Sequence, residues 1–241
     1  MKKIWLKSYP PGVPAEIDLN QFASLGDLFD KSVTRFAGHT AYVNMGKSIS
    51  YAQLDSLSRQ FAGYLQGELK LARGARVALM MPNCLQYPIA MFGVLRAGYT
   101  VVNVNPLYTA RELEHQLKDA GCEAILIVEN FAHTLQDVLP RTQIRQVVVT
   151  GLGDMLGFPK SLLVNFVIRH VKKMVPEWSI PGYVSFRDSL ARGAAHPLQP
   201  VTLTHDDLAY LQYTGGTTGV AKGAMLTHGN IVANLQQAHA W

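Results

Sequence analysis

Cysteine, charge and long apolar runs are all scarce in this sequence of 241 residues. Its two cysteines, Cys84 and Cys122, are too few and too far apart for a disulfide framework or a four-ligand zinc site. We expect both to be small buried apolar residues in a reducing cytosol. Charged residues form only 16% of the chain and hydrophobic residues 48%, which excludes a disordered protein and predicts a globular one with a sizeable core.

Several functional motifs are also missing. No apolar run is long enough to cross a bilayer, and residues 1–7 contain too few apolar side chains for a signal peptide. The sequence has no His-Glu-x-x-His pair and no nucleophile elbow, so neither a zinc enzyme nor a serine hydrolase is indicated. The net charge of +5 favours anionic partners. Nucleic acid is not expected among them, because zinc-finger spacing, RNA-binding aromatic motifs and long basic runs are absent.

Strand and helix patterns alternate along the middle of the chain. Short apolar strands are expected near residues 77–81, 100–104, 124–128 and 146–150, with helices between them. Nearly uninterrupted apolar strands are typical of a mainly parallel sheet that helices cover on both faces, so the predicted fold class is α/β. We expect three parts: an N-terminal arm with helices and a hairpin (1–75), an α/β subdomain (76–200) and the start of a second subdomain (201–241).

Residues 160–175 are predicted to form a basic amphipathic helix within the α/β subdomain. At 100° per residue, one arc is apolar and holds Leu163, Val164, Val167, Ile168, Val171, Met174 and Val175. The opposite arc holds Ser161, Asn165, Arg169, Lys172 and Lys173, and no acidic residue interrupts the segment. Such a helix either docks its apolar arc on its own sheet or lies on an anionic membrane surface, and both interpretations remain open.

The segment from Tyr213 to Gly223 carries the strongest functional signal. It reads Tyr-Thr-Gly-Gly-Thr-Thr-Gly-Val-Ala-Lys-Gly, in which Gly215, Gly216 and Gly219 let the backbone approach a ligand closely. Thr214, Thr217 and Thr218 add hydroxyl groups and Lys222 adds a cation, an inventory that suits phosphate oxygens. It is not a Walker A loop, because glycine follows Lys222 where that motif needs serine or threonine. Strand-like segments flank it, so we expect it to join two strands, and the simplest alternative is an ordinary glycine-rich hairpin.

This segment resembles the nucleotide-binding signature of AMP-forming acyl-CoA synthetases, the superfamily that includes luciferases and peptide-synthetase adenylation domains. Gly216 stands where many members have serine, and Ala221 where many have proline. Four further runs are similar to bacterial long-chain fatty-acid-CoA ligases, and the likeness covers essentially the whole chain: Ala78–Asn83, Gln86–Pro88, Arg96–Gly98 and Val101–Thr109.

The resemblance implies the N-terminal part of the adenylate-forming fold and a two-step reaction. A fatty carboxylate attacks ATP to give acyl-adenylate and pyrophosphate, and the thiol of coenzyme A then displaces AMP. The implied phosphate donors are the hydroxyls of Thr214, Thr217 and Thr218, with Thr214 also a candidate ligand of Mg²⁺. Lys222 and Thr214 are the candidate catalytic residues. The other implied members of the binding segment are Tyr213, Gly215, Gly216, Gly219 and Gly223, and nothing in the sequence gives Tyr213 a role beyond ending the strand.

Residues outside the loop carry weaker signals. Asn103, Asn105 and Tyr108 are candidates for ligand contact, although a turn at Asn105–Pro106 is the favoured interpretation. His228 is placed near the loop, where helix capping around residues 227–230 is favoured over a role in the site.

Members of the family are more than twice this length, so we expect a truncated N-terminal fragment without turnover of its own. Two alternatives remain: an adenylating enzyme for an aryl or amino acid, and a non-catalytic nucleotide-binding or membrane-docking module. The expected location is the cytoplasm, with the inner face of the cytoplasmic membrane if the basic helix binds lipid. A homodimer is left open.

Overall fold

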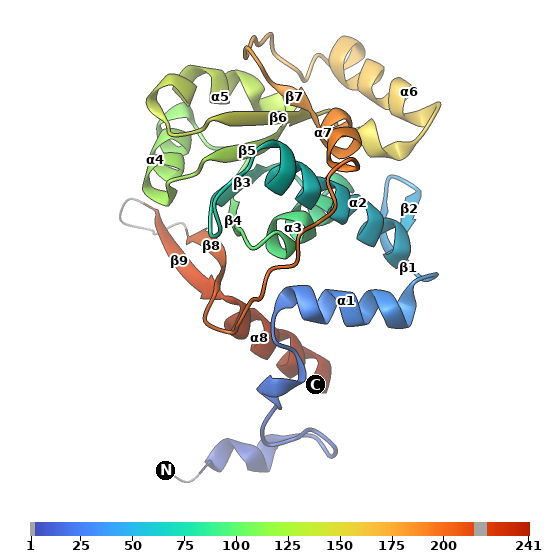
Figure 1. Ribbon diagram of the computed structural model, residues 1–241, viewed down its shortest axis with the longest axis vertical. Coiled ribbons are helices and arrows are strands. Elements are labelled where there is room, and N and C mark those ends of the chain that lie inside the picture. The colour runs from blue at the N-terminus through green and yellow to red at the C-terminus, as the bar shows by residue number, and fades with distance from the viewer. Residues whose placement is uncertain (1–2, 215–220) are drawn as a thin grey trace.

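The computed structural model describes residues 3–214 and 221–241, and a seven-stranded sheet forms its centre (Figure 1). The strands are β3 (Arg76–Met80), β4 (Thr100–Asn103), β5 (Ala124–Val128), β6 (Gln146–Thr150), β7 (Val184–Ser185), β8 (Leu208–Thr214) and β9 (Lys222–Thr227). Their order is β7-β6-β5-β3-β4-β8-β9, and every neighbouring pair is parallel except the hairpin of β8 and β9. The predicted α/β fold with a mainly parallel sheet is confirmed.

Helices cover both faces of this sheet. Alternate side chains of a strand point to opposite faces, so Val77 and Leu79 of β3 enter one core while Ala78 and Met80 enter the other. The first core is closed by α1 (Leu25–Phe36), α2 (Tyr51–Gly63), α3 (Gln86–Arg96) and α7 (Phe186–Gly193). The second is closed by α4 (Ala110–Ala120) and α5 (Ala132–Val138). We call these the α3 face and the α4 face (Figure 1).

The helices begin where the sequence places capping residues. Ser50 and Thr109 form capping boxes with Gln53 and Glu112, and Ser24 accepts a hydrogen bond from the amide of Asp27. Thr227 forms a third box with Asn230 at the start of α8 (His228–Ala240). Gly121 ends α4 with a φ of 61°, a left-handed conformation that favours glycine. Local capping chemistry therefore determines where these helices start and stop.

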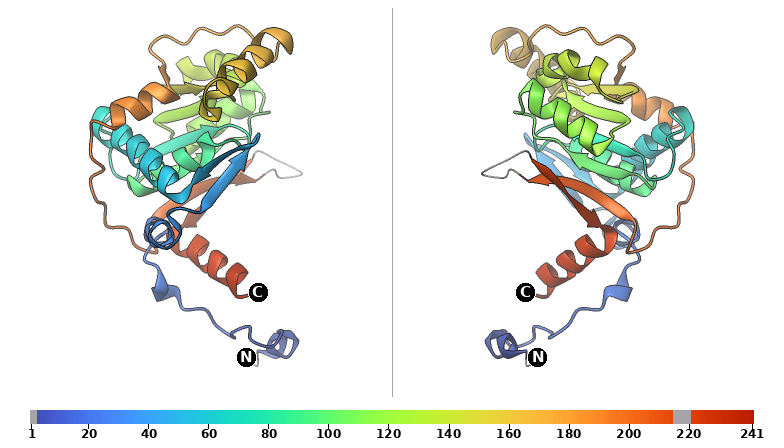
Figure 2. Two further views of the ribbon diagram at one scale, coloured as in Figure 1. Left: turned by 90° about the vertical axis from the view of Figure 1, so that its right-hand side faces the viewer. Right: turned by 90° about the vertical axis from the view of Figure 1, so that its left-hand side faces the viewer.

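The N-terminal region lies against the α3 face and then extends away from it. A two-stranded hairpin of β1 (Thr40–Asn44) and β2 (Lys47–Ser50) leads into α2. The first residues form short 3-10 turns and run beside the end of α8 (Figure 2). There the rings of Tyr9 and Trp241 pack edge to face, with their centroids 5.2 Å apart. The division into subdomains at residue 200 remains a prediction, although β4 and β8, on either side of it, pair in one sheet.

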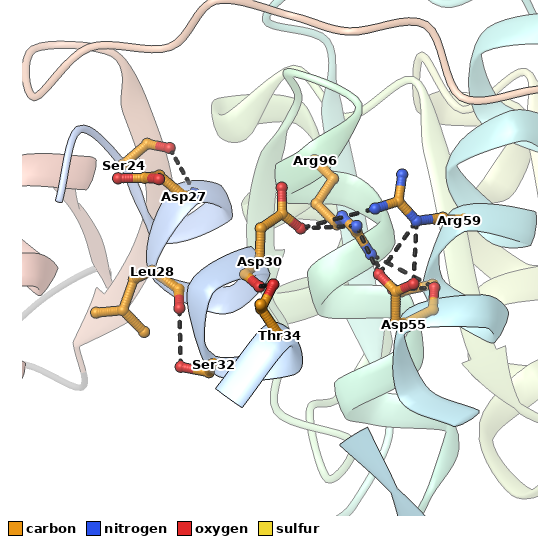
Figure 3. A network of polar contacts seen from close by, with 10 residues as sticks. Ser24, Asp27, Leu28, Asp30, Ser32, Thr34, Asp55, Arg59 and Arg96 are labelled. Carbon is orange, nitrogen blue, oxygen red and sulfur yellow. Dashed lines mark hydrogen bonds and ion pairs between the residues drawn. The ribbon is translucent and has the colours of Figure 1, made fainter. Parts of the chain in front are cut away.

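A buried arginine joins three helices of the α3 face (Figure 3). Arg96 of α3 is 6% exposed, and its guanidinium lies 2.7 Å from carboxylate oxygens of both Asp30 in α1 and Asp55 in α2. It also donates to the hydroxyl of Ser58 at 2.9 Å. The cluster therefore connects α1, α2 and α3, although Asp30 and Arg96 are 66 residues apart in the sequence.

The predicted helix of residues 160–175 is shorter than expected, and the side that faces the protein does not match the predicted apolar arc. It consists of α6 (Lys160–Phe166) and a π-helical turn (Val167–Val171), and Lys173 then adopts a φ of 51°, which ends the helical path. Ser161 is buried, and Asn165 bonds to the amide of Gly153 and to Asp154 at 2.8 Å each. Ser161 and Asn165 of the polar arc thus face the protein, while Val164, Val167 and Ile168 of the apolar arc are half-buried, so the covered side combines parts of both arcs.

The two cysteines are buried, as predicted. Burial raises the pKa of both thiols, that of Cys122 to about 12, so both are protonated at neutral pH. In the described part of the chain, no helix is long and apolar enough to cross a membrane.

Candidate functional site

The β8–β9 hairpin supports the predicted phosphate loop. Thr214 is the last residue of β8 and lies opposite Lys222, the first residue of β9. The prediction that the segment joins two strands is therefore confirmed. Gly215, Gly216, Thr217, Thr218 and Gly219 lie outside the described residues, and their predicted contacts stay predictions.

Thr214 and Lys222 share one face of the hairpin. Residues directly opposite each other in an antiparallel pair have their side chains on the same side, about 5 Å apart at Cβ. Both side chains are exposed at the end of the sheet, so a hydroxyl donor and an ammonium group lie together where the loop begins and ends. This pair can donate hydrogen bonds and positive charge to one anionic ligand.

Tyr213 points to the opposite face and has a clear structural role. Its side chain is buried beneath the hairpin, and its hydroxyl donates to the carboxylate of Asp119 in α4 at 2.5 Å. Burial, together with the negative charge of Asp119, raises the pKa of Tyr213, so the phenol keeps its proton. Across the strands its ring lies over Gly223, where a Cβ atom would come within 2.9 Å of the ring. The position of Gly223 thus requires glycine, because any larger residue would displace Tyr213.

The other stem of the hairpin also contacts α4. Nε2 of His115 lies 3.3 Å from the carbonyl oxygen of Ala221. A carbonyl can only accept a hydrogen bond, so Nε2 carries the proton in this contact. No sequence motif points to His115 or Asp119, because their partners are 106 and 94 residues away along the chain.

A row of polar side chains leads away from Thr214 along the α3 face. Gln212 of β8 accepts a hydrogen bond from Asn103 of β4 at 2.9 Å, and Asn103 accepts one from the hydroxyl of Tyr87 in α3, also at 2.9 Å. Asn103 was among the predicted candidates, whereas Tyr87 and Gln212 were not. Gln212 and Thr214 alternate with the buried Tyr213 along β8, so they point to the same side. We call Tyr87, Asn103 and Gln212 the polar row.

The polar row lies beside the switch point of the sheet, at the carboxyl end of β4. The strand order reverses between β3 and β5: the connection after β3 runs over the α3 face, and the connection after β5 runs over the α4 face. Ligands of open α/β sheets bind in the crevice that such a reversal opens at the carboxyl ends of the strands. A cavity of about 400 Å³ opens there between the β1–β2 hairpin and the start of α3, lined by Tyr42, Asn83, Cys84, Tyr87 and neighbours. Tyr87 belongs to both features, so the polar row adjoins the cavity.

The other candidates are structural. Asn105 accepts a hydrogen bond from the amide of Leu107 at 3.0 Å, and its carbonyl accepts one from the amide of Tyr108, which confirms the turn. His228 is buried, and its Nδ1 accepts a hydrogen bond from the amide of Leu25 at 3.2 Å. Burial lowers the pKa of His228, so it is neutral and joins the start of α8 to the start of α1.

The described residues offer little to a resident metal ion. Among them, no group of three or more histidine, cysteine, aspartate or glutamate side chains could ligate one. The hydroxyl of Thr214 is a hard oxygen ligand of the kind that Mg²⁺ accepts, and Mg²⁺ commonly takes its other ligands from substrate phosphates and water. The donor set therefore fits a metal ion that arrives with a nucleotide.

Comparison with known proteins gives one consistent family. The family of AMP-binding enzymes matches residues 29–241. The long-chain-fatty-acid–CoA ligase of Escherichia coli O157:H7 is 55% identical over 240 residues, covering 100% of this chain and 43% of the ligase. The corresponding ligase of Bacillus subtilis is 35% identical over 242 residues, covering 100% of this chain and 42% of its own length.

A solved structure has the same fold. It is a long-chain-fatty-acid-CoA ligase from Archaeoglobus fulgidus, with a TM-score of 0.72 at 23% identity, covering 96% of this chain and 42% of that one. The chain thus spans less than half the length of the relatives that it matches.

Proposed function

Since the chain belongs to the family of AMP-binding enzymes, we propose that it forms the N-terminal part of a long-chain fatty-acid-CoA ligase. The observation that carries the proposal is the β8–β9 hairpin, which brings Thr214 and Lys222 together beside the switch point. The identity of 55% over the whole chain supports a fatty acid as substrate over an aryl or amino acid. A module that binds nucleotide without catalysis is the third candidate, and the same hairpin would serve it.

In the proposed reaction, the fatty carboxylate attacks the α-phosphorus of ATP, which forms the acyl-adenylate and breaks the bond to pyrophosphate. The thiol of coenzyme A then attacks the acyl carbonyl, and AMP leaves. The departing pyrophosphate gains negative charge in the first step. The ammonium of Lys222 offsets this charge, and the hydroxyl of Thr214 donates a hydrogen bond to a phosphate oxygen. Backbone and hydroxyl donors between residues 215 and 219 complete the proposed set.

Mg²⁺ is part of the same proposal. Thr214 would hold it on the protein side, and the ion would add positive charge on the phosphate oxygens. The phosphates that Lys222 and Thr214 contact would supply further ligands of the ion. The chain therefore does not need to form a complete metal site by itself.

A long-chain fatty acid is expected to support ATP–pyrophosphate exchange by a complete ligase that contains this chain, whereas benzoate or a free amino acid is not. The measurement is the incorporation of labelled pyrophosphate into ATP with palmitate, benzoate or mixed amino acids. Residues 1–241 alone are expected to form no thioester. Exchange with benzoate or an amino acid in place of palmitate would contradict the substrate class, and thioester formation by residues 1–241 would contradict the assignment as one part of the enzyme.

We also propose that the surface around α6 contacts an anionic membrane surface, where a fatty acid partitions. Six large apolar side chains between residues 158 and 174 are more than half exposed: Phe158, Leu162, Leu163, Phe166, Val171 and Met174. We call them the α6 apolar surface. It lies at the end of the molecule away from both termini (Figure 2). Lys172 and Lys173 beside it are exposed and no acidic residue occurs between residues 158 and 176, so its charge complements anionic lipid.

Replacing Leu163 and Phe166 with glutamine is expected to lower binding to vesicles of phosphatidylglycerol and phosphatidylcholine by at least tenfold, since two buried side chains contribute about 1.5–3 kcal/mol each. Replacing Lys172 and Lys173 with glutamine is expected to weaken binding at low salt and have little effect at high salt. Co-sedimentation measures both. Val43→Gln in the β1–β2 hairpin, exposed to a similar degree, is the control. Equal binding by all variants and the wild type, or no binding by the complete protein, would contradict the proposal.

A further inference from the structure

Helix α4 contacts both stems of the hairpin that supports the proposed phosphate loop. Asp119 accepts a hydrogen bond from the hydroxyl of Tyr213 at the end of β8, and His115 donates to the carbonyl of Ala221 just before β9. The two residues are four positions apart, so they lie on one face of the helix, one turn from each other. In Figure 1, α4 lies beside the end of the hairpin at which β9 begins.

Helix α4 is itself well fixed. A capping box of Thr109 and Glu112 begins it, and Leu113 and Leu117 are fully buried in the core of the α4 face. Gln116, on the same helix, donates to the carbonyl of Asn103 in β4 at 2.7 Å, and Asn103 belongs to the polar row. The same helix therefore contacts both hairpin stems and Asn103, the β4 member of the polar row.

We propose that Asp119 and His115 are positioning residues for the phosphate-binding loop. The inference rests on the proposed function and adds to it. Lys222 follows Ala221 directly and Thr214 follows Tyr213 directly, so each contact fixes the backbone beside one of the two proposed phosphate donors. Donors stabilise a developing charge best when they are preorganised, and a shift of about 1 Å can lower a rate by about a hundredfold.

The chemistry separates a positioning role from a role in general stability. Pyrophosphate leaves in the first step, whereas the attack of coenzyme A on acyl-adenylate involves no pyrophosphate. Loss of either contact should therefore slow adenylate formation and leave thioester formation from supplied acyl-adenylate unchanged. A residue that only stabilises the fold would affect both steps through the amount of folded enzyme.

The first test removes the bond between Tyr213 and Asp119 from either end. In a complete ligase that contains this chain, Tyr213→Phe and Asp119→Ala are each expected to lower kcat/KM for ATP in the exchange assay by about tenfold or more, the value of one hydrogen bond to a charged group. The double variant is expected to lose no more than the stronger single variant, because both substitutions remove one bond. Thioester formation from synthetic palmitoyl-adenylate and coenzyme A should stay within about twofold of the wild type, below the effect of one hydrogen bond.

The second test exchanges the donor at position 115. The amide nitrogen of a glutamine side chain reaches the place of Nε2 of histidine, so His115→Gln should retain the contact with the carbonyl of Ala221 and most of the exchange activity. His115→Ala should lose about threefold to tenfold, since it removes a neutral hydrogen bond. Glu114→Gln is the matched control, because Glu114 also lies on α4 but pairs with Lys118 and Arg141, which are not hairpin residues.

The outcomes are distinguishable. If the wild type shows no acid-dependent exchange, the proposed function fails regardless of these variants. If Lys222→Ala lowers exchange while Asp119→Ala and His115→Ala do not, the positioning role alone is wrong. Equal losses in both half-reactions, in proportion to a loss of folded protein, would also overturn the positioning role.

Discussion

Replacing Lys222 with alanine is expected to lower ATP–pyrophosphate exchange by about 100- to 1,000-fold in a complete ligase that contains this chain, the effect of losing one preorganised donor to a developing charge. Lys222 is exposed at the start of β9, and its partner across the strands, Thr214, points to the same side. Because the charge develops on the leaving pyrophosphate, the loss should appear in kcat of the first half-reaction. Rapid mixing with palmitate and ATP, followed by quantification of acyl-adenylate, measures it.

Two further variants show whether charge or shape is responsible. Lys222→Arg keeps the positive charge with a different donor geometry and is expected to retain part of the activity. Lys173→Ala removes an exposed lysine of the α6 segment, far from the hairpin, and is expected to leave exchange unchanged. Wild-type exchange by Lys222→Ala would contradict the assignment of the loop, and the proposed mechanism would have to find its positive charge elsewhere.

Much of the fold could be predicted because its signals are local. Buried parallel strands read as short apolar runs, and capping boxes such as Thr109 with Glu112 mark helix starts within four residues. The segment after Lys160 was predicted less well. Helical periodicity shows which residues share a face but does not show which face meets the protein. That choice follows from Asn165, which finds partners in Gly153 and Asp154, and from the left-handed Lys173.

The candidate site likewise contains residues that the sequence indicates and residues that only the fold brings to it. The loop between Thr214 and Lys222 is contiguous in sequence, so its residue types alone indicated phosphate. Tyr87, His115 and Asp119 gave no such signal, because only the sheet order brings α3 and α4 to the ends of β4, β8 and β9. The role of Tyr213 was missed for the same reason: its partner lies on another element.

Burial determines how much an ion pair contributes, and the cluster in Figure 3 allows a direct comparison of two arginines. Arg96 and Arg59 contact the same two carboxylates, Asp30 and Asp55. The side chain of Arg96 is 3% exposed and that of Arg59 is 50% exposed. Arg96 also donates to the hydroxyl of Ser58 and lies over the ring of Phe29, at 5.2 Å from its centroid. The two arginines therefore differ in their own exposure to water and not in the carboxylates that they contact.

Arg96→Met is therefore expected to lower the free energy of unfolding by about 1.5–3 kcal/mol, the value of hydrogen bonds to a charged group, because the carboxylates left behind are partly exposed and keep Arg59 as a partner. Methionine keeps much of the side-chain volume but removes the buried cation, so Asp30 and Asp55 keep only the exposed Arg59 as a partner. Arg59→Met, the matched control, is expected to cost at most about 1 kcal/mol, as for exposed pairs. Urea unfolding followed by circular dichroism, with unchanged m-values, measures both. Similar losses from the two variants would mean that exposure does not control the strength of this cluster, and that α1, α2 and α3 are held together by their apolar contacts instead.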